Sequence, residues 1–399
     1  MFWSDKMKGK IKRHLFFYTI LRPVVYLVAK VLLNYSCKPA PIVDGPYIVL
    51  ANHTTNWDPV LVGCSFKKPM NFIASEHAMR MGFLSKIIGA LFVPIQRVKG
   101  STDASAALGM VSMLKKGISV GLFPEGSRSF DGTTEALHPT TGRLIKMSGA
   151  SLITYRISGG YLTSPRWGYK LRRGKVCGEV VNIYTSEQIK AMSPQEITDC
   201  INRDIAENAF DRQREKAYKY YVKGSAEGIE RVLYLCPECK RIGTISSSGS
   251  ELSCSCGMHA TMNKYGFFEG EDLKFDSIDK WNKWQVSYLA ELAEDENFRL
   301  CDEDQQLYVL DREHNLELKC NGTMSLDRNG FRIGDMICPI DKLQMSIIRK
   351  QDIVFAHGGV NYEIHSDKSR SAYKYTTMLK MLQTKILQSK NAKKEKLVK

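Results

Sequence analysis

Residues 47–59 read YIVLANHTTNWDP, an apolar run that changes abruptly to polar residues and then to an Asp-Pro pair. The run Tyr47–Ala51 is short and apolar at every position, which predicts a buried strand. His53 and Asp58 follow it five residues apart, so an ideal helix would place them about 140° apart and could not pair them. We therefore expect a turn that folds His53 back, followed by a helix with Asp58 as its cap and Pro59 at its first position.

A histidine and an aspartate brought together by such a turn can act as a general base. The carboxylate of Asp58 would hold one ring nitrogen of His53, and the other nitrogen would take a proton from an attacking hydroxyl. Taken alone, the two residues are better explained as a helix cap and a loop histidine.

A second pattern of strand followed by polar turn occurs about seventy residues later. Gly121–Phe123 predicts a short strand, and residues 123–129 read FPEGSRS. Between the two patterns, residues 93–97 read VPIQR, an apolar run that ends in a cation. The guanidinium groups of Arg97 and Arg128 could clamp a phosphate through paired hydrogen bonds.

In this order, NHTTNWD and FPEGSRS resemble the signature blocks of the glycerolipid acyltransferase family, the PlsC-type lysophosphatidic acid acyltransferases. The resemblance covers roughly residues 1–220 and implies an α/β acyltransferase core. It implies that His53 is the general base and that Asp58 orients it. It further implies a phosphate or acceptor site shaped by Arg97, Glu125, Gly126 and Arg128.

The resemblance also implies a reaction: acyl transfer from acyl-CoA or acyl carrier protein to a lysophospholipid, most directly lysophosphatidic acid, in phospholipid biosynthesis. Two alternatives stay open. One is acylation of another lysolipid or of glycerol 3-phosphate, and the other is a catalytically silent membrane scaffold.

Three positions depart from the family pattern. Ser127 stands where Thr is common, Gln96 stands where an acid is frequent, and Thr154 stands where Pro would fall. Because Pro fixes a backbone geometry that Thr does not, Thr154 puts the pocket beside its strand in question. The segment that follows, residues 159–167 (GGYLTSPRW), is either part of the acceptor site or a surface loop.

Residues 15–33 read LFFYTILRPVVYLVAKVLL, a run long enough to span a bilayer. Arg22 lies near its middle, where it costs roughly 2.5 to 3.5 kcal/mol on insertion scales, and Pro23 removes a helix hydrogen bond. We expect two short helices hinged at Arg22-Pro23 that lie in the membrane interface. The alternative is one tilted transmembrane helix with Arg22 reaching the surface.

The charge of the chain favours an anionic lipid surface as its partner. The 399 residues carry a formal net charge of +15, and residues 1–50 alone hold eight basic and two acidic side chains. Eleven cysteines, an odd number and mostly scattered, argue against a secreted disulfide scaffold. We expect peripheral or monotopic attachment to the cytoplasmic face of the cell membrane.

The cysteines that do cluster predict a structural zinc site. Cys236 and Cys239 precede Cys254 and Cys256 across a short Ser- and Gly-rich hairpin, as in a zinc ribbon. The second pair is tightly spaced, so His259 could replace Cys254 or Cys256. The hairpin lacks interleaved basic and aromatic residues, which argues against a nucleic-acid partner.

The C-terminal part predicts an amphipathic helix over Ser277–Glu294, a set of short strands and a closing helix over Ser369–Leu387. The expected strands are Gln306–Leu310, Leu316–Lys319, Thr323–Leu326, Gly330–Ile333, Leu343–Ile348, Ile353–Ala356 and Val360–Ile364. Seven strands capped by one helix resemble a pleckstrin-homology-like (PH-like) barrel, a module that binds lipid headgroups or proteins. The tail from Lys390 is expected to fray.

Four segments follow from these patterns. They are membrane-associated helices over 1–40, an acyltransferase domain over 41–225, a zinc ribbon over 232–262, and a linker helix with the PH-like domain over 263–390.

Overall fold

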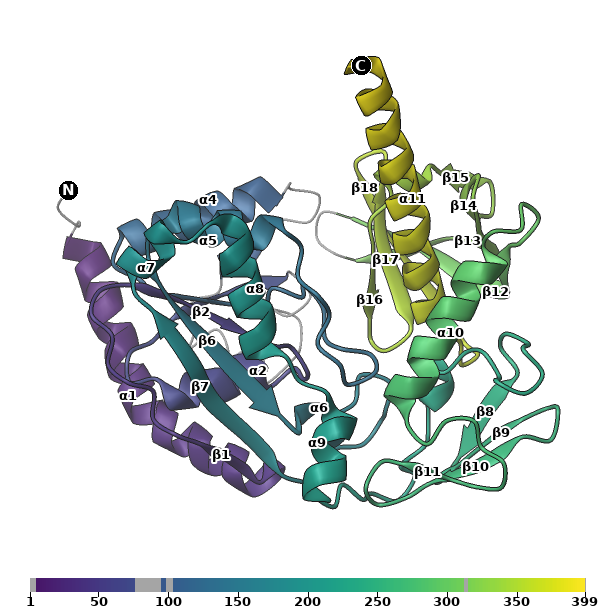
Figure 1. Cartoon of the computed structure of the whole chain (residues 1–399), viewed down its shortest axis with the longest axis horizontal. Coiled ribbons are helices and arrows are strands. Elements are labelled where there is room, and N and C mark those ends of the chain that lie inside the picture. The colour runs from purple at the N-terminus through teal and green to yellow at the C-terminus, as the bar shows by residue number, and fades with distance from the viewer. Residues whose placement is uncertain (1–4, 76–94, 98–102, 312–314, 399) are drawn as a thin grey trace. The chain divides into compact units, whose positions relative to one another are not determined.

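The computed structural model describes residues 5–75, 95–97, 103–311 and 315–398, drawn in colour in Figure 1. The chain forms two compact units. The N-terminal unit comprises Met1–Arg166, Lys170–Val222 and Lys264–Gly266, and the C-terminal unit comprises Trp167–Tyr169, Lys223–Asn263 and Phe267–Lys399. Residues 1–4 of the expected membrane segment and residues 93–94 of the expected strand before Arg97 lie outside the described residues.

The N-terminal unit is built on one seven-stranded mixed sheet. Its strands are β1 (Tyr35–Cys37), β2 (Tyr47–Ala51), β3 (Asn71–Ser75), β4 (Ile95–Arg97), β5 (Val120–Leu122), β6 (Ser151–Ser158) and β7 (Val176–Tyr184). They lie in the order β1-β7-β6-β2-β5-β3-β4, and only β1 and β7 run opposite to the others. The strands β2 and β5 are parallel neighbours, so the two motifs that follow them leave the sheet at the same edge.

Helices cover both faces of this sheet (Figure 1). The helices α1 (Asp5–Leu33) and α2 (Asp58–Ser65) lie on one face, and α4 (Asp103–Lys115), α5 (Thr140–Ser148), α7 (Ser186–Ala191) and α8 (Pro194–Ile205) lie on the other. Alternate residues of β2 pack into the two layers, with Val49 toward α2 and Ile48 toward α8. A strand buried on both faces must be apolar throughout, which explains the sequence of Tyr47–Ala51.

The N-terminal apolar segment forms one helix, so the expected hinge at Arg22-Pro23 is wrong. The helix α1 runs from Asp5 to Leu33 with Pro23 inside it. Packing on both sides of the proline outweighs the lost hydrogen bond, because Tyr18 before it and Ala29 after it are both buried in the same core. By length and composition alone, Leu15–Leu33 could cross a membrane.

The charged stretch after Ser193 forms two helices. The helix α8 begins with a capping box, in which Ser193 and Glu196 exchange side-chain to backbone hydrogen bonds. The chain leaves the helix after Ile205, and the side chain of Asn208 caps a second helix, α9 (Ala209–Lys216). An internal Asn cap therefore divides a segment whose composition reads as continuous helix.

The C-terminal unit contains two antiparallel sheets. The smaller joins β8 (Ile245–Ser248), β9 (Glu251–Cys254), β10 (His259–Met262) and β11 (Phe268–Glu269), and α10 (Ile278–Leu292) follows it. The larger has the order β15-β14-β13-β12-β18-β17-β16. Its strands are β12 (Leu300–Leu310), β13 (Leu316–Asp327), β14 (Gly330–Ile333), β15 (Met336–Cys338), β16 (Met345–Ile348), β17 (Asp352–His357) and β18 (Val360–Ser366).

The larger sheet and the helix that packs on it differ from the sequence-based expectations in three ways. The strands expected at Leu316–Lys319 and Thr323–Leu326 are one strand, β13, because residues 320–322 continue the ladder opposite 305–307 of β12. The strand β15 was missed, since its three residues form too short a pattern to detect. The closing helix α11 (Ala372–Val398) continues through most of the tail expected to fray, and it packs on the sheet through Tyr375, Leu379 and Leu382.

Candidate active site

The carboxylate of Asp58 is the fully buried centre of the turn after β2. The helix α2 begins at Asp58 itself, and the preceding Trp57 occupies the cap position, so the expectation that Asp58 caps the helix is wrong. The carboxylate turns back onto the preceding turn, where it accepts hydrogen bonds from the backbone N–H groups of Thr54 (2.5 Å) and Thr55 (2.9 Å). The Thr55 hydroxyl donates a further bond of 2.6 Å to the same group.

This turn brings the side chain of His53 against Asp58, which two residues five positions apart could not achieve on one helix. The Nδ1 atom of His53 lies 2.8 Å from Oδ2 of Asp58, and the imidazole stacks on the ring of Phe123 at a centroid distance of 4.3 Å. With the Nδ1 proton donated to the carboxylate, Nε2 is the nitrogen left to accept a proton. The side chain of His53 remains 21% exposed, so a substrate can reach it.

The surroundings of His53 favour its neutral form. Burial lowers the pKa of His53 from the usual 6.5, and the positive charges of Arg128 and Arg166 lower it further, while the hydrogen bond and charge of Asp58 oppose them. A general base must be unprotonated to act, so a lowered pKa keeps this imidazole available near neutral pH.

Two hydrogen bonds join the two sequence motifs. The backbone N–H of His53 donates to Oε1 of Glu125 at 2.6 Å, and the backbone N–H of Ser129 donates to the carbonyl of His53 at 2.9 Å. Glu125 also accepts the N–H of Glu135 at 3.1 Å. Burial raises the pKa of Glu125 from 4.5 to about 8. These bonds show that the Glu125 carboxyl holds the turn of His53 in place, and its expected part in the acceptor site remains a prediction.

Gly126 and Arg128 complete the second motif. Gly126 has φ +72° and closes the turn with a 3.1 Å bond from its N–H to the carbonyl of Phe123, a conformation that favours glycine. Arg128 lies close enough to Asp58 and His53 for their charges to interact, and burial lowers its pKa. A partly buried cation beside the base can hold an anionic group of a substrate.

The structure places Arg97 only by its backbone. It ends β4, the edge strand, and pairs with Ser75 of β3. Two strands, β3 and β5, separate β4 from β2 in the sheet. The expected clamp between Arg97 and Arg128 remains a prediction.

Thr154, which stands where the family has Pro, lies on β6 opposite Leu50 of β2. Its hydroxyl donates to Oδ2 of Asp204 on α8 at 2.9 Å and accepts the N–H of Asn182 at 3.1 Å. These bonds join β6 to α8 and to β7, so the Thr154 hydroxyl has a structural role in the packing of α8 on the sheet.

Two residues of the segment 159–167, Gly160 and Arg166, contact the turns that follow β2 and β5. A Cβ at Gly160 would lie 2.3 Å from the hydroxyl of Thr54, so only glycine lets the short helix α6 (Gly160–Thr163) approach the turn that carries His53. Arg166, which is 7% exposed, donates to the FPEGSRS turn. The Gly159-Gly160 pair is the signal from which this close approach could have been anticipated.

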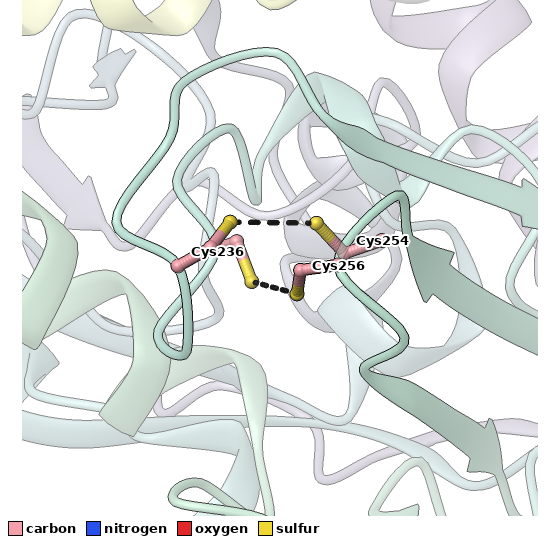
Figure 2. A group of neighbouring side chains, drawn as sticks. Cys236, Cys254 and Cys256 are labelled. Atoms are coloured by element: carbon pink, nitrogen blue, oxygen red, sulfur yellow. Dashed lines mark hydrogen bonds between the residues drawn. The ribbon is translucent and has the colours of Figure 1, made fainter.

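A second candidate site is the cluster of four cysteines in the C-terminal unit. The ligand atoms of Cys236, Cys239, Cys254 and Cys256 all lie within 4.8 Å of one another, and Figure 2 shows sulfur atoms of the group pointing toward each other. Two of the sulfur pairs, 236–256 and 239–254, are 3.7 Å apart. A tetrahedron with Zn–S bonds of about 2.3 Å has sulfur atoms about 3.8 Å apart, so the thiols fit a zinc ion.

His259 does not belong to this cluster. It begins β10, its side chain is 54% exposed, and its Nε2 lies 3.7 Å from a carboxylate oxygen of Glu251. The alternative in which His259 replaces a cysteine ligand therefore finds no support in the geometry.

Comparison with known proteins identifies an acyltransferase domain. Residues 33–158 match the family model named Acyltransferase. A 1-acyl-sn-glycerol-3-phosphate acyltransferase of Borreliella burgdorferi is 25% identical over 109 residues, which make up 27% of this chain and 43% of that protein. The matched region thus spans less than half of this relative.

A solved structure is also similar, that of the 1-acyl-sn-glycerophosphate (LPA) acyltransferase PlsC from Thermotoga maritima. It aligns with 18% sequence identity and a TM-score of 0.38 over 51% of this chain and 82% of that one. The match of residues 33–158 to the family model shows that the chain carries an acyltransferase domain, and this range contains His53, Asp58, Glu125, Gly126 and Arg128.

Proposed function

We propose that this protein is a membrane-surface enzyme that transfers a fatty acyl group from acyl-CoA or acyl carrier protein to lysophosphatidic acid, giving phosphatidic acid. The observation that carries the proposal is the His53–Asp58 pair, joined at 2.8 Å on the turn after β2, beside the partly buried cation of Arg128. The curated relative, named for this activity, supports the choice of acceptor.

The residues suggest a direct transfer. Nε2 of His53 takes the proton of the lipid hydroxyl as its oxygen forms a bond to the thioester carbonyl. The tetrahedral intermediate then expels the thiol by breaking the C–S bond, and the imidazolium returns the proton to the sulfur. Asp58 stabilises the imidazolium, Arg128 binds the acceptor phosphate, and no covalent acyl-enzyme is needed.

The helix α1 supports attachment along the membrane surface. One side of α1 packs on α2: the Tyr18 hydroxyl donates to the carbonyls of Gly63 (2.7 Å) and Phe66 (3.0 Å) at the end of that helix. The Arg22 guanidinium donates to the Phe66 carbonyl at 3.0 Å. The other side exposes large apolar side chains: Leu15, Phe16, Phe17, Ile20, Val24, Leu27, Val28, Val31 and Leu32.

A helix docked lengthwise on the catalytic unit is suited to lie in the interface and not to cross the bilayer. Arg22 already has a protein partner, so the membrane need not accommodate its charge. Peripheral or monotopic attachment to anionic phospholipids of the cytoplasmic face is the arrangement that we propose.

In the C-terminal unit, we propose one structural zinc held by Cys236, Cys239, Cys254 and Cys256. Four thiolates close a tetrahedral coordination sphere, so the ion would support the fold and leave no position for a catalytic water. We further propose that the larger sheet with α11 is a PH-like module. The sheet is antiparallel throughout, and its two meanders, β12 to β15 and β16 to β18, are joined through the pairing of β12 with β18.

One assay tests the proposed activity. The purified protein is given lysophosphatidic acid, other lysolipids or glycerol 3-phosphate, each with acyl-CoA and with acyl carrier protein thioester, and the products are identified by mass spectrometry. We expect phosphatidic acid to form fastest. A faster reaction with another acceptor would show that this acceptor, and not lysophosphatidic acid, is the substrate. If no acceptor is acylated by either donor, the protein is instead the catalytically silent membrane scaffold.

A further inference from the structure

Arg166 lies beneath the turn that carries Arg128. Its Nη1 donates to the hydroxyl of Ser127 at 2.6 Å and to the carbonyl of Arg128 at 3.0 Å. Its guanidinium carbon lies 4.0 Å from the ring centroid of Phe130. One side chain thus contacts three residues of a four-residue turn.

The turn has need of such support. Gly126 and Ser127 are exposed, and Gly126 has the open glycine conformation at φ +72°, with no atom within 4 Å of where a Cβ would lie. The turn is tied on one side by the bond from Ser129 N–H to the carbonyl of His53. Arg166 holds it from the other side, and a buried, planar guanidinium that makes two hydrogen bonds and a ring contact is a rigid support.

We propose that Arg166 is a positioning residue, which fixes the turn Ser127–Phe130 so that the Arg128 guanidinium is set to bind the acceptor phosphate beside His53. The inference rests on the proposed function, because it takes Arg128 as the phosphate anchor. It adds a residue from the segment 159–167 that lies outside both sequence motifs.

The charge of Arg166 has a second consequence at the base. It is one of the positive charges that lower the pKa of His53. Removing the charge should therefore raise the pKa of His53, while a lysine at the same position should largely keep the effect. This titration reports whether the charge of Arg166 acts on His53, and the selective loss of phosphate binding reports its positioning role.

The experiment compares Arg166→Gln and Arg166→Lys with the wild type and with Arg156→Gln. Arg156 is a matched control: it lies on β6, is about one-third exposed and pairs with Glu179 at 2.9 Å. Binding of a water-soluble short-chain lysophosphatidic acid and of its phosphate-free monoacylglycerol is measured by calorimetry, and the His53 ring is titrated by NMR.

We expect both Arg166 variants to bind the phosphate-bearing lipid about tenfold or more weakly, since charge-assisted hydrogen bonds contribute roughly 1.5 to 3 kcal/mol. Binding of the monoacylglycerol should be unchanged. The His53 titration should move to higher pH in Arg166→Gln and stay near that of the wild type in Arg166→Lys. Arg156→Gln should match the wild type in all three measurements.

The binding and NMR measurements do not require turnover, so the two proposals can fail separately. If the wild type transfers no acyl group but the Arg166 variants selectively lose binding of the phosphate-bearing lipid, the proposed acyl transfer is wrong and the positioning role of Arg166 is supported. If Arg166→Gln binds both lipids as the wild type does, or if the wild type shows no preference for the phosphate, the role of Arg166 is overturned.

A second variant covers the case in which Arg166→Gln does not fold. Ser127→Ala removes an exposed acceptor of the Arg166 bond and leaves the buried arginine in place. We expect a smaller, several-fold loss of binding to the phosphate-bearing lipid and none to the monoacylglycerol. Equal binding of both lipids by Ser127→Ala and the wild type would then count against the proposal.

Discussion

The catalytic turn depends on a carboxylate with several simultaneous partners. Asp58 accepts bonds from two backbone N–H groups, from the hydroxyls of Thr54 and Thr55 and from the ring of His53. A carboxylate is an acceptor at both oxygens, whereas an amide has only one accepting oxygen. The charge at position 58 therefore sets both the shape of the turn and the orientation of the imidazole.

We expect His53→Ala to lower the turnover about 100-fold to 10,000-fold, because a weakly acidic lipid hydroxyl then lacks its base. Rates are measured with saturating acceptor and thioester. His138→Ala, which removes an exposed histidine of the same unit, is the control and should remain near the wild-type rate. Near-normal transfer by His53→Ala would exclude the general-base role.

Asp58→Asn should impair both rate and stability, unlike His53→Ala. The amide at position 58 would point an NH₂ group at N–H and O–H donors of the turn, which would then lack an acceptor. We therefore expect the free energy of unfolding to fall by about 1 to 3 kcal/mol. Urea denaturation measures the stability, and the rate is measured below the denaturation range. An unchanged free energy of unfolding would contradict the geometry of the turn.

Glu125 should make the stability depend on pH. Its pKa rises from 4.5 in the unfolded chain to about 8 in the fold, so between these values the folded state holds one proton more. Its contribution to stability is therefore fully present below about pH 4.5 and is lost as the pH rises through about 8. Between these two pH values, the free energy of unfolding should fall by up to about 1.4 kcal/mol per pH unit because of this group.

Glu125→Gln should remove this part of the slope, as measured by urea denaturation from pH 5 to pH 9. Glu215→Gln, a change to an exposed carboxyl of α9, is the control and should leave the slope as in the wild type. If the difference between Glu125→Gln and the wild type is the same at every pH, the carboxyl titrates normally and the assignment is wrong.

At the residue scale, the sequence predicted which side chains meet but not how. The resemblance to the acyltransferase family implied that Asp58 pairs with His53, and the five-residue spacing required a turn for that contact, which the structure shows at 2.8 Å. The cap assigned to Asp58 was wrong because Asp-Pro at a helix start also fits a first helical residue whose carboxylate points backward. The contacts of Arg166 connect positions 39 residues apart, which no local pattern predicts.

At the scale of elements, α1 presents two unlike sides to its surroundings. Tyr18, Ala29 and Leu33 are buried against the catalytic unit, while Leu27 and Val31 are 60% and 59% exposed. The apolar run and its arginine could be read from the sequence. The hinge was expected because Pro23 removes a helix hydrogen bond, an effect that the sequence alone predicts. The hydrogen-bond acceptor of Arg22 could not be predicted, because it is the backbone carbonyl of Phe66, 44 residues later, which only the folded chain places beside the guanidinium.

We expect Leu27→Glu combined with Val31→Glu to release the protein from anionic vesicles, as measured by sedimentation. Each exposed side chain would otherwise gain about 1.5 to 3 kcal/mol on burial in lipid. Leu108→Glu, at a leucine of α4 that is 69% exposed, is the matched control and should bind as the wild type. Full sedimentation of the double variant would place the membrane contact elsewhere.

At the scale of the whole molecule, the chain combines two compact units with different sources of stability. The N-terminal unit buries apolar residues on both faces of its sheet. In the C-terminal unit, the four-stranded sheet β8–β11 is small, and Cys254 of the cysteine cluster ends its strand β9. The spacing of the cysteines predicted that they cluster, and the zinc ion itself remains a prediction. The strand order of the larger sheet depends on pairings between distant segments, such as β12 with β18, which no local pattern predicts.

Zinc removal should therefore loosen one part of the molecule and spare another. We expect about one zinc per chain in protein prepared without chelator, and loss of that zinc in Cys254→Ser, which should also lose hydrogen-exchange protection across residues 236–262. The sheet around His53 should keep its protection, because its core contains no metal ligand. Cys301→Ser, at an exposed cysteine outside the cluster, is the control and should retain zinc. Protein that contains no zinc, or Cys254→Ser that keeps both its zinc and its protection, would show that the 3.7 Å sulfur spacing reflects packing of reduced thiols and not a metal site.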